Sequence, residues 1–300
     1  MSDPIATVKR ELLVRHLEAW APAALHRGRR VIYAHGYADD DGGASAEAAL
    51  RVLCDQSDLV RGRELTMVAV GEDLSAIADR LAAVQREAGV AAGPAVHTVS
   101  GGTGSRLGVA LQAAGAQRVP LLGYLDAASA SEPPAAATVA ALTAGKPAEL
   151  LLVLAPGEPA DAYRARWPLF TQVELATGDE PGQLLAFGTT AGKSLEGFKE
   201  ALWAVDEFAG VRYRDPADPD RHLIDISLRP HPGPLRRELL AHLERVGSAT
   251  VTELRTFALT ETVYRAADAT RVLQTLVESG AVTRRPPHGR LGGDVLISAG

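Results

Sequence analysis

The sequence contains very little cysteine. Its single thiol, Cys54, excludes a disulfide framework and a zinc cluster built from thiolates. The eight histidines show no ligand spacing, so we expect no metal. No apolar run approaches the length of a membrane span, and the first residues lack the apolar segment of a signal peptide. We therefore expect a cytoplasmic protein that makes no contact with a membrane.

Positive charge is also scarce over most of the chain. The formal net charge of −6 argues against a strong nucleic-acid binder. From Arg229 to the end, however, the sequence has ten arginines and seven acidic residues. The net charge of this part is +3, which leaves −9 for the rest of the chain. This asymmetry gives modest support to a nucleic-acid contact in the C-terminal part.

Apolar runs alternate with helical patterns along the first two thirds of the chain. Runs as continuous as these suit strands that are buried on both faces of a parallel sheet. A turn cluster at 177–182 then separates two further strands, which we expect to form an antiparallel hairpin. We predict an α/β fold over residues 1–210, with a Rossmann-like, doubly wound, mostly parallel sheet of seven strands as in class I methyltransferases. The first five strands are expected at 30–34, 65–70, 95–99, 119–125 and 150–154.

The C-terminal residues follow a different pattern. A polar stretch at 211–234 is predicted to be a linker or lid. Residues 235–300 contain three helical patterns, and Thr250 and Glu253 have capping-box spacing at the start of the second. Two short strands follow, at 282–285 and 294–297, with a glycine- and proline-containing loop between them. Three helices followed by a β-ribbon predict a small winged-helix domain.

Three segments of the chain resemble the three-Cys-motif partner proteins. They are residues 9–20, residues 30–38, and residues 192–206, which resemble the late helix of that family. The resemblance implies a methyltransferase-like domain that binds S-adenosylmethionine (SAM), with Gly36 and Tyr37 at the cofactor and Asp126 in the catalytic pocket. Glu72, just past the second strand, stands where such folds place an acid on the ribose hydroxyls. A solvated acid near a helix start is an equal alternative for Glu72.

The chain departs from that family at the tip of the first strand. His35 stands where the family has Asp, and Asp39–Asp41 stand where its Gly-Pro-Gly is expected. Ala127 follows Asp126 where the family continues with Pro-Phe-Gly. Aspartate has a Cβ that obstructs close backbone approach, and its charge repels the cofactor's carboxylate. Our leading hypothesis is therefore a degenerate methyltransferase-like protein that acts as a binding or regulatory component. The alternative is an active SAM-dependent methyltransferase that uses Glu72 and Asp126, possibly on nucleic acid.

Two other motifs offer competing interpretations. The glycine-rich turn at residues 100–107 resembles the phosphate-binding loop of sugar-nucleotide transferases, with Ser105 and Arg106 as phosphate contacts in a nucleotide-handling enzyme. A glycine-rich strand-to-helix turn without a ligand is favoured over it. The Asp39–Asp41 run offers oxygen ligands for Mg²⁺, but a solvated turn is favoured there too.

Arginines cluster on the recognition helix and wing of the predicted winged helix. There they could contact phosphate groups of a nucleic acid, while homodimerisation or docking of a protein partner is the alternative. The candidates are Arg265, Arg271, Arg284, Arg285 and Arg290.

Overall fold

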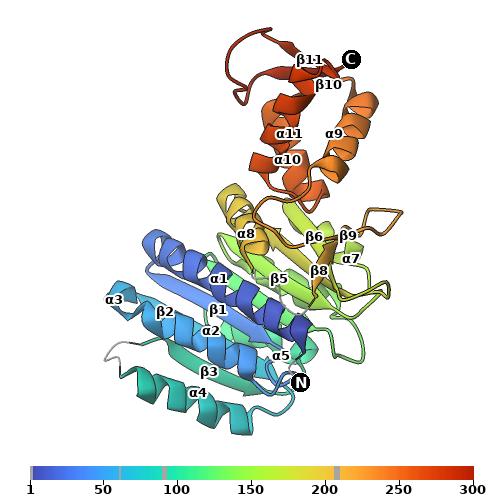
Figure 1. The fold of residues 1–300 in the computed structure, drawn as a ribbon. Coiled ribbons are helices and arrows are strands. Elements are labelled where there is room, and N and C mark those ends of the chain that lie inside the picture. Colours follow the sequence, from blue (N-terminus) through green and yellow to red (C-terminus); the bar gives the residue numbers. More distant parts are fainter. Residues whose placement is uncertain (1–2, 61, 90–92, 206–209) are drawn as a thin grey trace.

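A computed structural model describes residues 3–60, 62–89, 93–205 and 210–300. Most of the chain forms one large α/β domain, and the last part forms a small second domain (Figure 1). The predicted α/β class with a mostly parallel sheet is therefore confirmed. Asp206, the last residue of the family resemblance, lies outside the described residues. The expected domain boundary at 210 is the first described residue after that gap. In the described part of the chain, no helix is long and apolar enough to cross a membrane.

A nine-stranded sheet forms the centre of the large domain, in the order β3-β2-β1-β4-β5-β7-β6-β8-β9. The strands β1 to β5 pair in parallel, and β7 runs antiparallel between β5 and β6, which confirms the expected hairpin. The bounds are β1 Arg30–Gly36, β2 Glu64–Gly71, β3 Ala95–Ser100, β4 Leu121–Ala127, β5 Ala148–Leu154, β6 Leu169–Ala176, β7 Gln183–Thr189, β8 Arg212–Arg214 and β9 Leu223–Ile224.

The last two strands correct the prediction of seven. They come from the segment expected to be a linker or lid, and β8 pairs antiparallel with β6. The apolar pattern missed β8 because its sequence is Arg-Tyr-Arg. Arg214 can nevertheless be buried there, because it donates to a Glu174 oxygen at 2.5 Å and to two carbonyls of the β6–β7 turn.

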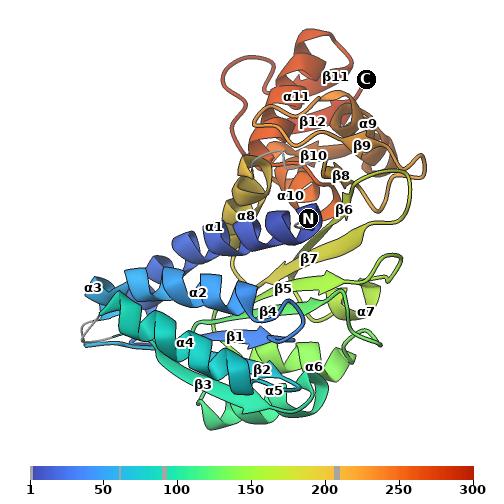
Figure 2. The same ribbon diagram turned by 60° about the horizontal axis from the view of Figure 1, so that its bottom comes forward.

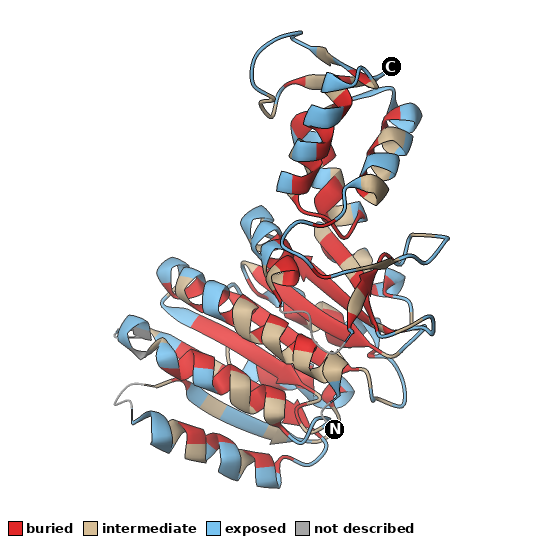
Figure 3. Cartoon of the chain, viewed as in Figure 1, coloured by how far each residue is buried: buried red, intermediate tan, exposed pale blue. Residues whose placement is uncertain are grey.

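Helices cover both faces of the sheet (Figure 2). The helices α1, α2, α4 and α8 pack on one face, and α5, α6 and α7 pack on the other. Figure 3 shows the central strands buried between them, whereas the edge strand β3 is largely exposed. The helices are α1 Pro4–Arg27, α2 Ala44–Asp55, α3 Ser57–Val60, α4 Ser75–Ala88, α5 Thr103–Ala113, α6 Ala136–Ala140, α7 Asp161–Arg164 and α8 Gly192–Ala204, with a short 3-10 helix at Ala141–Ala144.

The C-terminal domain packs three helices against a small sheet of order β10-β12-β11. The capping box at Thr250 and Glu253 is present, as its spacing predicts. Strand β10, which ends at Thr250, was not expected from the sequence. The elements are α9 Gly233–Val246, β10 Ser248–Thr250, α10 Val251–Glu261, α11 Ala266–Glu278, β11 Val282–Arg285 and β12 Leu296–Ala299.

Candidate functional site

The carboxyl ends of the parallel strands bring the predicted cofactor residues to one edge of the sheet. Ligands of open α/β sheets bind at this edge. Gly36 ends β1 and Tyr37 follows it with a φ of 56°, a left-handed conformation that is uncommon for a residue with a side chain. Glu72 follows β2, and Asp126 lies near the end of β4. Whether these residues bind a cofactor depends on the space and charge around them.

Protein side chains already occupy the space beside Gly36. A Cβ at this position would lie 2.6 Å from the Leu125 side chain and 2.7 Å from the Thr103 methyl group. The Tyr37 backbone N–H donates to the Thr103 hydroxyl at 2.9 Å. The glycine therefore allows the end of β1 to pack against the start of α5, and this packing explains it without a cofactor.

Two of the three consecutive aspartates have structural partners. Asp39 accepts a hydrogen bond from the backbone N–H of Asp73 at 3.1 Å, so its carboxylate bridges the loops after β1 and β2. Gly71 must lack a side chain, because a Cβ there would collide with this carboxylate. Asp41 accepts from the backbone N–H and the hydroxyl of Ser45, at 2.8 and 2.6 Å, and so tethers the start of α2.

Asp40, like Asp41, is exposed, but its carboxylate has no hydrogen-bond partner within the described part of the chain. Partial desolvation and the charges of Asp39 and Asp126 raise the pKa of its carboxyl group to about 6. In the described part of the chain, the Asp39–Asp41 run does not form a group of three side chains close enough to hold a metal. The expected solvated turn is thus only partly correct, because two of the three carboxylates tie loops together.

His35 is buried where the family resemblance places an aspartate. Its Nδ1 lies 2.8 Å from the Tyr33 hydroxyl, and its ring packs edge-on against Tyr124 with 5.0 Å between centroids. Burial lowers the pKa of this imidazole to about 4, despite the nearby charges of Asp41 and Asp126. The side chain is therefore neutral at pH 7 and contributes to the core.

Asp126 is held by the protein itself. The Lys9 ammonium group of α1 lies 2.7 Å from its Oδ2, and both side chains are largely buried. The Tyr124 hydroxyl donates to the same oxygen at 3.1 Å, and the Ala128 N–H donates to Oδ1 at 3.3 Å. Sequence patterns could not reveal Lys9 as its partner, because α1 and β4 meet only in the folded chain.

The glycine-rich turn after β3 packs against the loop that contains Glu72. The Gly101 N–H donates to the Gly71 carbonyl at 2.8 Å, and the exposed Glu72 carboxylate lies 2.8 Å from the position of a Cβ on Gly102. Arg106 folds over Gly101, and the Ser105 hydroxyl bonds within its own turn to the Gly102 carbonyl. These contacts are those of a compact strand-to-helix turn.

Three of the five candidate arginines have partners within the protein. Arg265 is buried and donates to Asp268 at 2.8 Å, to Glu200 of α8 and to the Leu228 carbonyl. Arg271 is exposed, and its guanidinium lies 2.5 Å from Asp268. Arg284 donates to backbone carbonyls of the loop between β11 and β12, those of Pro286, His288, Gly289 and Arg290.

The remaining two arginines point into solvent. Arg285 ends β11 and Arg290 lies in the loop that follows, and both are exposed. Neither guanidinium group forms a hydrogen bond or ion pair with any residue of the described part of the chain. Of the five candidates, these two are the ones free to contact an external anion.

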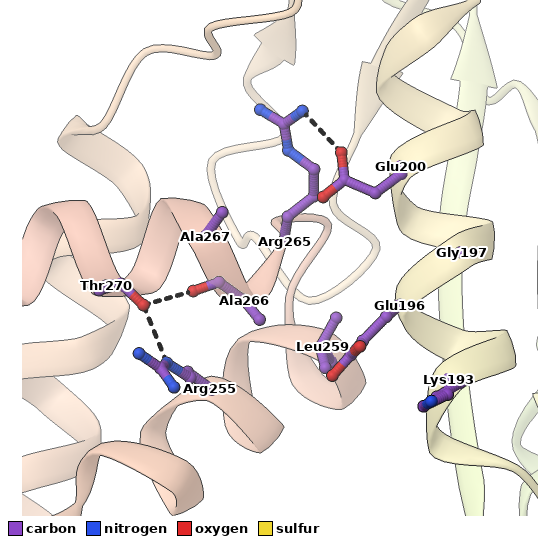
Figure 4. Close-up of a pocket in the computed structure, with 10 residues that line it drawn as sticks. All are labelled: Lys193, Glu196, Gly197, Glu200, Arg255, Leu259, Arg265, Ala266, Ala267 and Thr270. Atoms are coloured by element: carbon purple, nitrogen blue, oxygen red, sulfur yellow. Dashed lines mark hydrogen bonds and ion pairs between the residues drawn. The ribbon is translucent and has the colours of Figure 1, made fainter. Parts of the chain in front are cut away.

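A cleft of about 560 Å³ separates α8 from α10 and α11. The start of α11, with Ala266, Ala267 and Thr270, forms one wall, and Glu196 and Glu200 of α8 stand opposite (Figure 4). The first turn of α11 therefore faces the sheet domain and two carboxylates. The lining also includes Lys193, Arg255 and Arg265, so charges of both signs surround this turn.

The β8–β9 turn places Asp218, Asp220 and His222 with ligand atoms within 4.8 Å of one another. The Asp218 carboxylate accepts hydrogen bonds from the backbone N–H groups of Asp220 and His222, at 3.0 Å each. It also lies 2.8 Å from the His222 ring. These bonds within the turn account for the cluster without an ion.

No protein-family model matches the chain, and no curated protein matches it. The chain is similar to a solved structure of spermidine synthase in complex with the transition state analogue AdoDATO, at 12% identity and a TM-score of 0.37. The similarity covers 65% of this chain and 65% of that one, which is just under two thirds of its length. A similarity at this level says nothing about substrate or cofactor.

Proposed function

We propose that this protein is a methyltransferase-like scaffold that has lost conventional SAM binding and acts as a binding component through its C-terminal domain. The strand order β3-β2-β1-β4-β5-β7-β6 matches the class I methyltransferase sheet and supports the first half of the proposal. The observation that carries the loss of the cofactor is the Asp39 carboxylate, which spans the loops after β1 and β2 by bonding to the Asp73 amide.

The energetic cost of admitting the cofactor follows from this geometry. The carboxylate of SAM would meet the Asp39 charge, and a like-charge contact at about 4 Å costs from about 1 kcal/mol in water to about 4 near a protein surface. Displacing Asp39 from the Asp73 N–H costs about 1 kcal/mol more. A total of about 2–5 kcal/mol weakens binding by a factor of roughly 30 to several thousand.

Calorimetry with SAM and with S-adenosylhomocysteine tests this proposal. We expect no binding of either at micromolar concentration, and micromolar binding to the wild-type protein would overturn the proposal. Asp39→Gly removes the obstructing carboxylate and should strengthen binding at least tenfold, to within measurable range. Asp220→Gly makes the same change of charge in the distant β8–β9 turn and should have no effect.

The C-terminal domain offers a second candidate function. Its order of helices and strands, from α9 to β12, supports the prediction of a winged helix, in which the β11–β12 loop would be the wing. The observation that favours nucleic-acid contact is the pair of exposed, unpartnered guanidinium groups of Arg285 and Arg290 on that wing. The wing, and not the first turn of α11, would then touch the phosphates, because that turn faces α8.

Binding to a DNA duplex measured across a salt series tests the wing contact. The slope of log K against log salt is negative, and each lost phosphate contact makes it shallower by about 1. Arg285→Ala with Arg290→Ala should therefore make it shallower by about 2. Arg27→Ala with Arg29→Ala removes two exposed arginines from the sheet domain and should leave it unchanged. An unchanged slope in the wing variant would leave protein docking as the role of this domain.

A further inference from the structure

Three buried side chains of the sheet domain hold one turn of the C-terminal domain. This turn, Thr262–Val263, joins α10 to α11. Lys199 of α8 donates to the Thr262 carbonyl at 2.5 Å, and the Trp203 indole N–H donates to the Val263 carbonyl at 3.0 Å. Asp215, which follows β8, accepts a hydrogen bond from the Val263 backbone N–H. The backbone of the turn is thus hydrogen-bonded to two parts of the larger domain, α8 and the segment after β8.

Charged groups in this joint are buried without direct ion pairing. Lys199 is fully buried and forms no salt bridge within the described part of the chain, and the buried Asp215 Oδ2 has no hydrogen-bond partner. Glu238 of α9 faces the same space and is partly buried. The charged groups that act on Lys199 are Asp215, Glu238 and Glu261, and those that act on Glu238 are Asp215, Asp218, Arg237 and Lys199.

Burial moves the pKa values of these groups towards neutrality. Desolvation lowers the pKa of Lys199 to about 7, and the nearby carboxylates only partly oppose it. Desolvation together with the Asp215 and Asp218 charges raises the pKa of Glu238 to about 7. Desolvation also raises the pKa of Asp215. Because opening the joint would return these groups to water, opening is coupled to the binding and release of protons.

We propose that Lys199, Asp215 and Glu238 form a proton-sensitive latch, which holds the C-terminal domain on the sheet domain and holds it least firmly near neutral pH. The closed joint disfavours the charged amine, so the contribution of Lys199 strengthens the latch as pH rises from about 7 towards 10.5. The closed joint favours the neutral carboxyl, so the contribution of Glu238 strengthens it as pH falls from about 7 towards 4.5.

Opening this latch would uncover a specific surface. The first turn of α11 now lines the cleft opposite α8, and Arg265 connects the two walls through its 3.2 Å contact with Glu200. Ala267 is already exposed there, and separation of the domains would remove the wall opposite and leave the whole turn accessible. The latch therefore controls access to α11, whether the domain binds nucleic acid or protein, and its test does not depend on the proposed function.

Hydrogen exchange of the Trp203 indole N–H, followed by NMR, measures the opening directly. This group is buried and bonded across the joint, so its protection relative to a free indole at the same pH reports the closed-to-open ratio. We expect protection to be lowest near pH 7 and roughly twentyfold higher two pH units to either side. The buried Trp20 indole in α1 is the internal reference for opening of the sheet domain.

Variants separate the two arms of this profile. Lys199→Met keeps a buried apolar chain and should remove the rise above pH 7. Glu238→Gln should reduce the rise below pH 7 to the part that Asp215 contributes. Lys193→Met, on the exposed part of the same helix, should leave both arms unchanged. A flat wild-type profile, an alkaline rise that persists in Lys199→Met, or a Trp20 profile that follows Trp203 would each overturn the latch.

Discussion

The buried imidazole of His35 should make the protein less stable in acid by a calculable amount. Its pKa is about 4 in the folded chain, against 6.5 for an imidazole in water, a difference of 2.5 units. The pKa is lower in the folded chain. Between pH 4 and pH 6.5 the imidazole is therefore protonated in the unfolded chain but largely neutral in the folded one. Stability is therefore fully present above pH 6.5 and declines as pH falls towards 4.

The size of this loss follows from linkage. One pKa unit corresponds to about 1.36 kcal/mol, so this histidine alone should cost the folded state about 2 kcal/mol by pH 5 and about 3 by pH 4. His35→Asn removes the titrating ring and keeps a group able to hydrogen-bond the Tyr33 hydroxyl. It should cost a constant amount through lost packing at every pH, without the acid-dependent part.

Urea unfolding at several pH values, followed by circular dichroism, measures this difference. The free energy of unfolding of wild-type protein minus that of His35→Asn should fall by about 3 kcal/mol between pH 7 and pH 4. Subtraction cancels the other titrating groups, and His97→Asn, at an exposed histidine of the edge strand β3, serves as a control whose difference stays small. Parallel wild-type and His35→Asn curves would refute the assignment of a neutral, buried imidazole.

Two further substitutions test the packing that positions the site. Gly36→Ala places a Cβ within 2.7 Å of two side chains, and we expect it to cost about 1–3 kcal/mol of stability in thermal unfolding, against less than about 0.5 for Gly178→Ala, which has open space. Arg214→Met leaves the buried Glu174 without its closest cation and should cost about 3–5 kcal/mol in urea unfolding, part of which the added Glu174→Gln change should restore. A neutral result for Gly36→Ala, or additive effects for the second pair, would contradict these contacts.

Local signals along the chain were enough to predict the α/β class, the alternating strands and helices and the antiparallel hairpin. Each depends on the apolar pattern of a short segment or on turn residues, which act over a few positions. The capping box at Thr250 is equally local. The cofactor candidates, from Gly36 to Asp126, also lie together at one edge as expected, because parallel strands end on the same side of a sheet. Their function stays a prediction.

Contacts between distant segments were decided only by the tertiary structure. The partner of Asp126 is Lys9, the Asp39 carboxylate reaches the Asp73 amide, and Arg265 donates to Asp268. A charged side chain looks the same in the sequence whether it faces solvent or a buried counter-charge. Which of these it meets depends on strand order and helix packing, and these bring together residues that no sequence spacing connects.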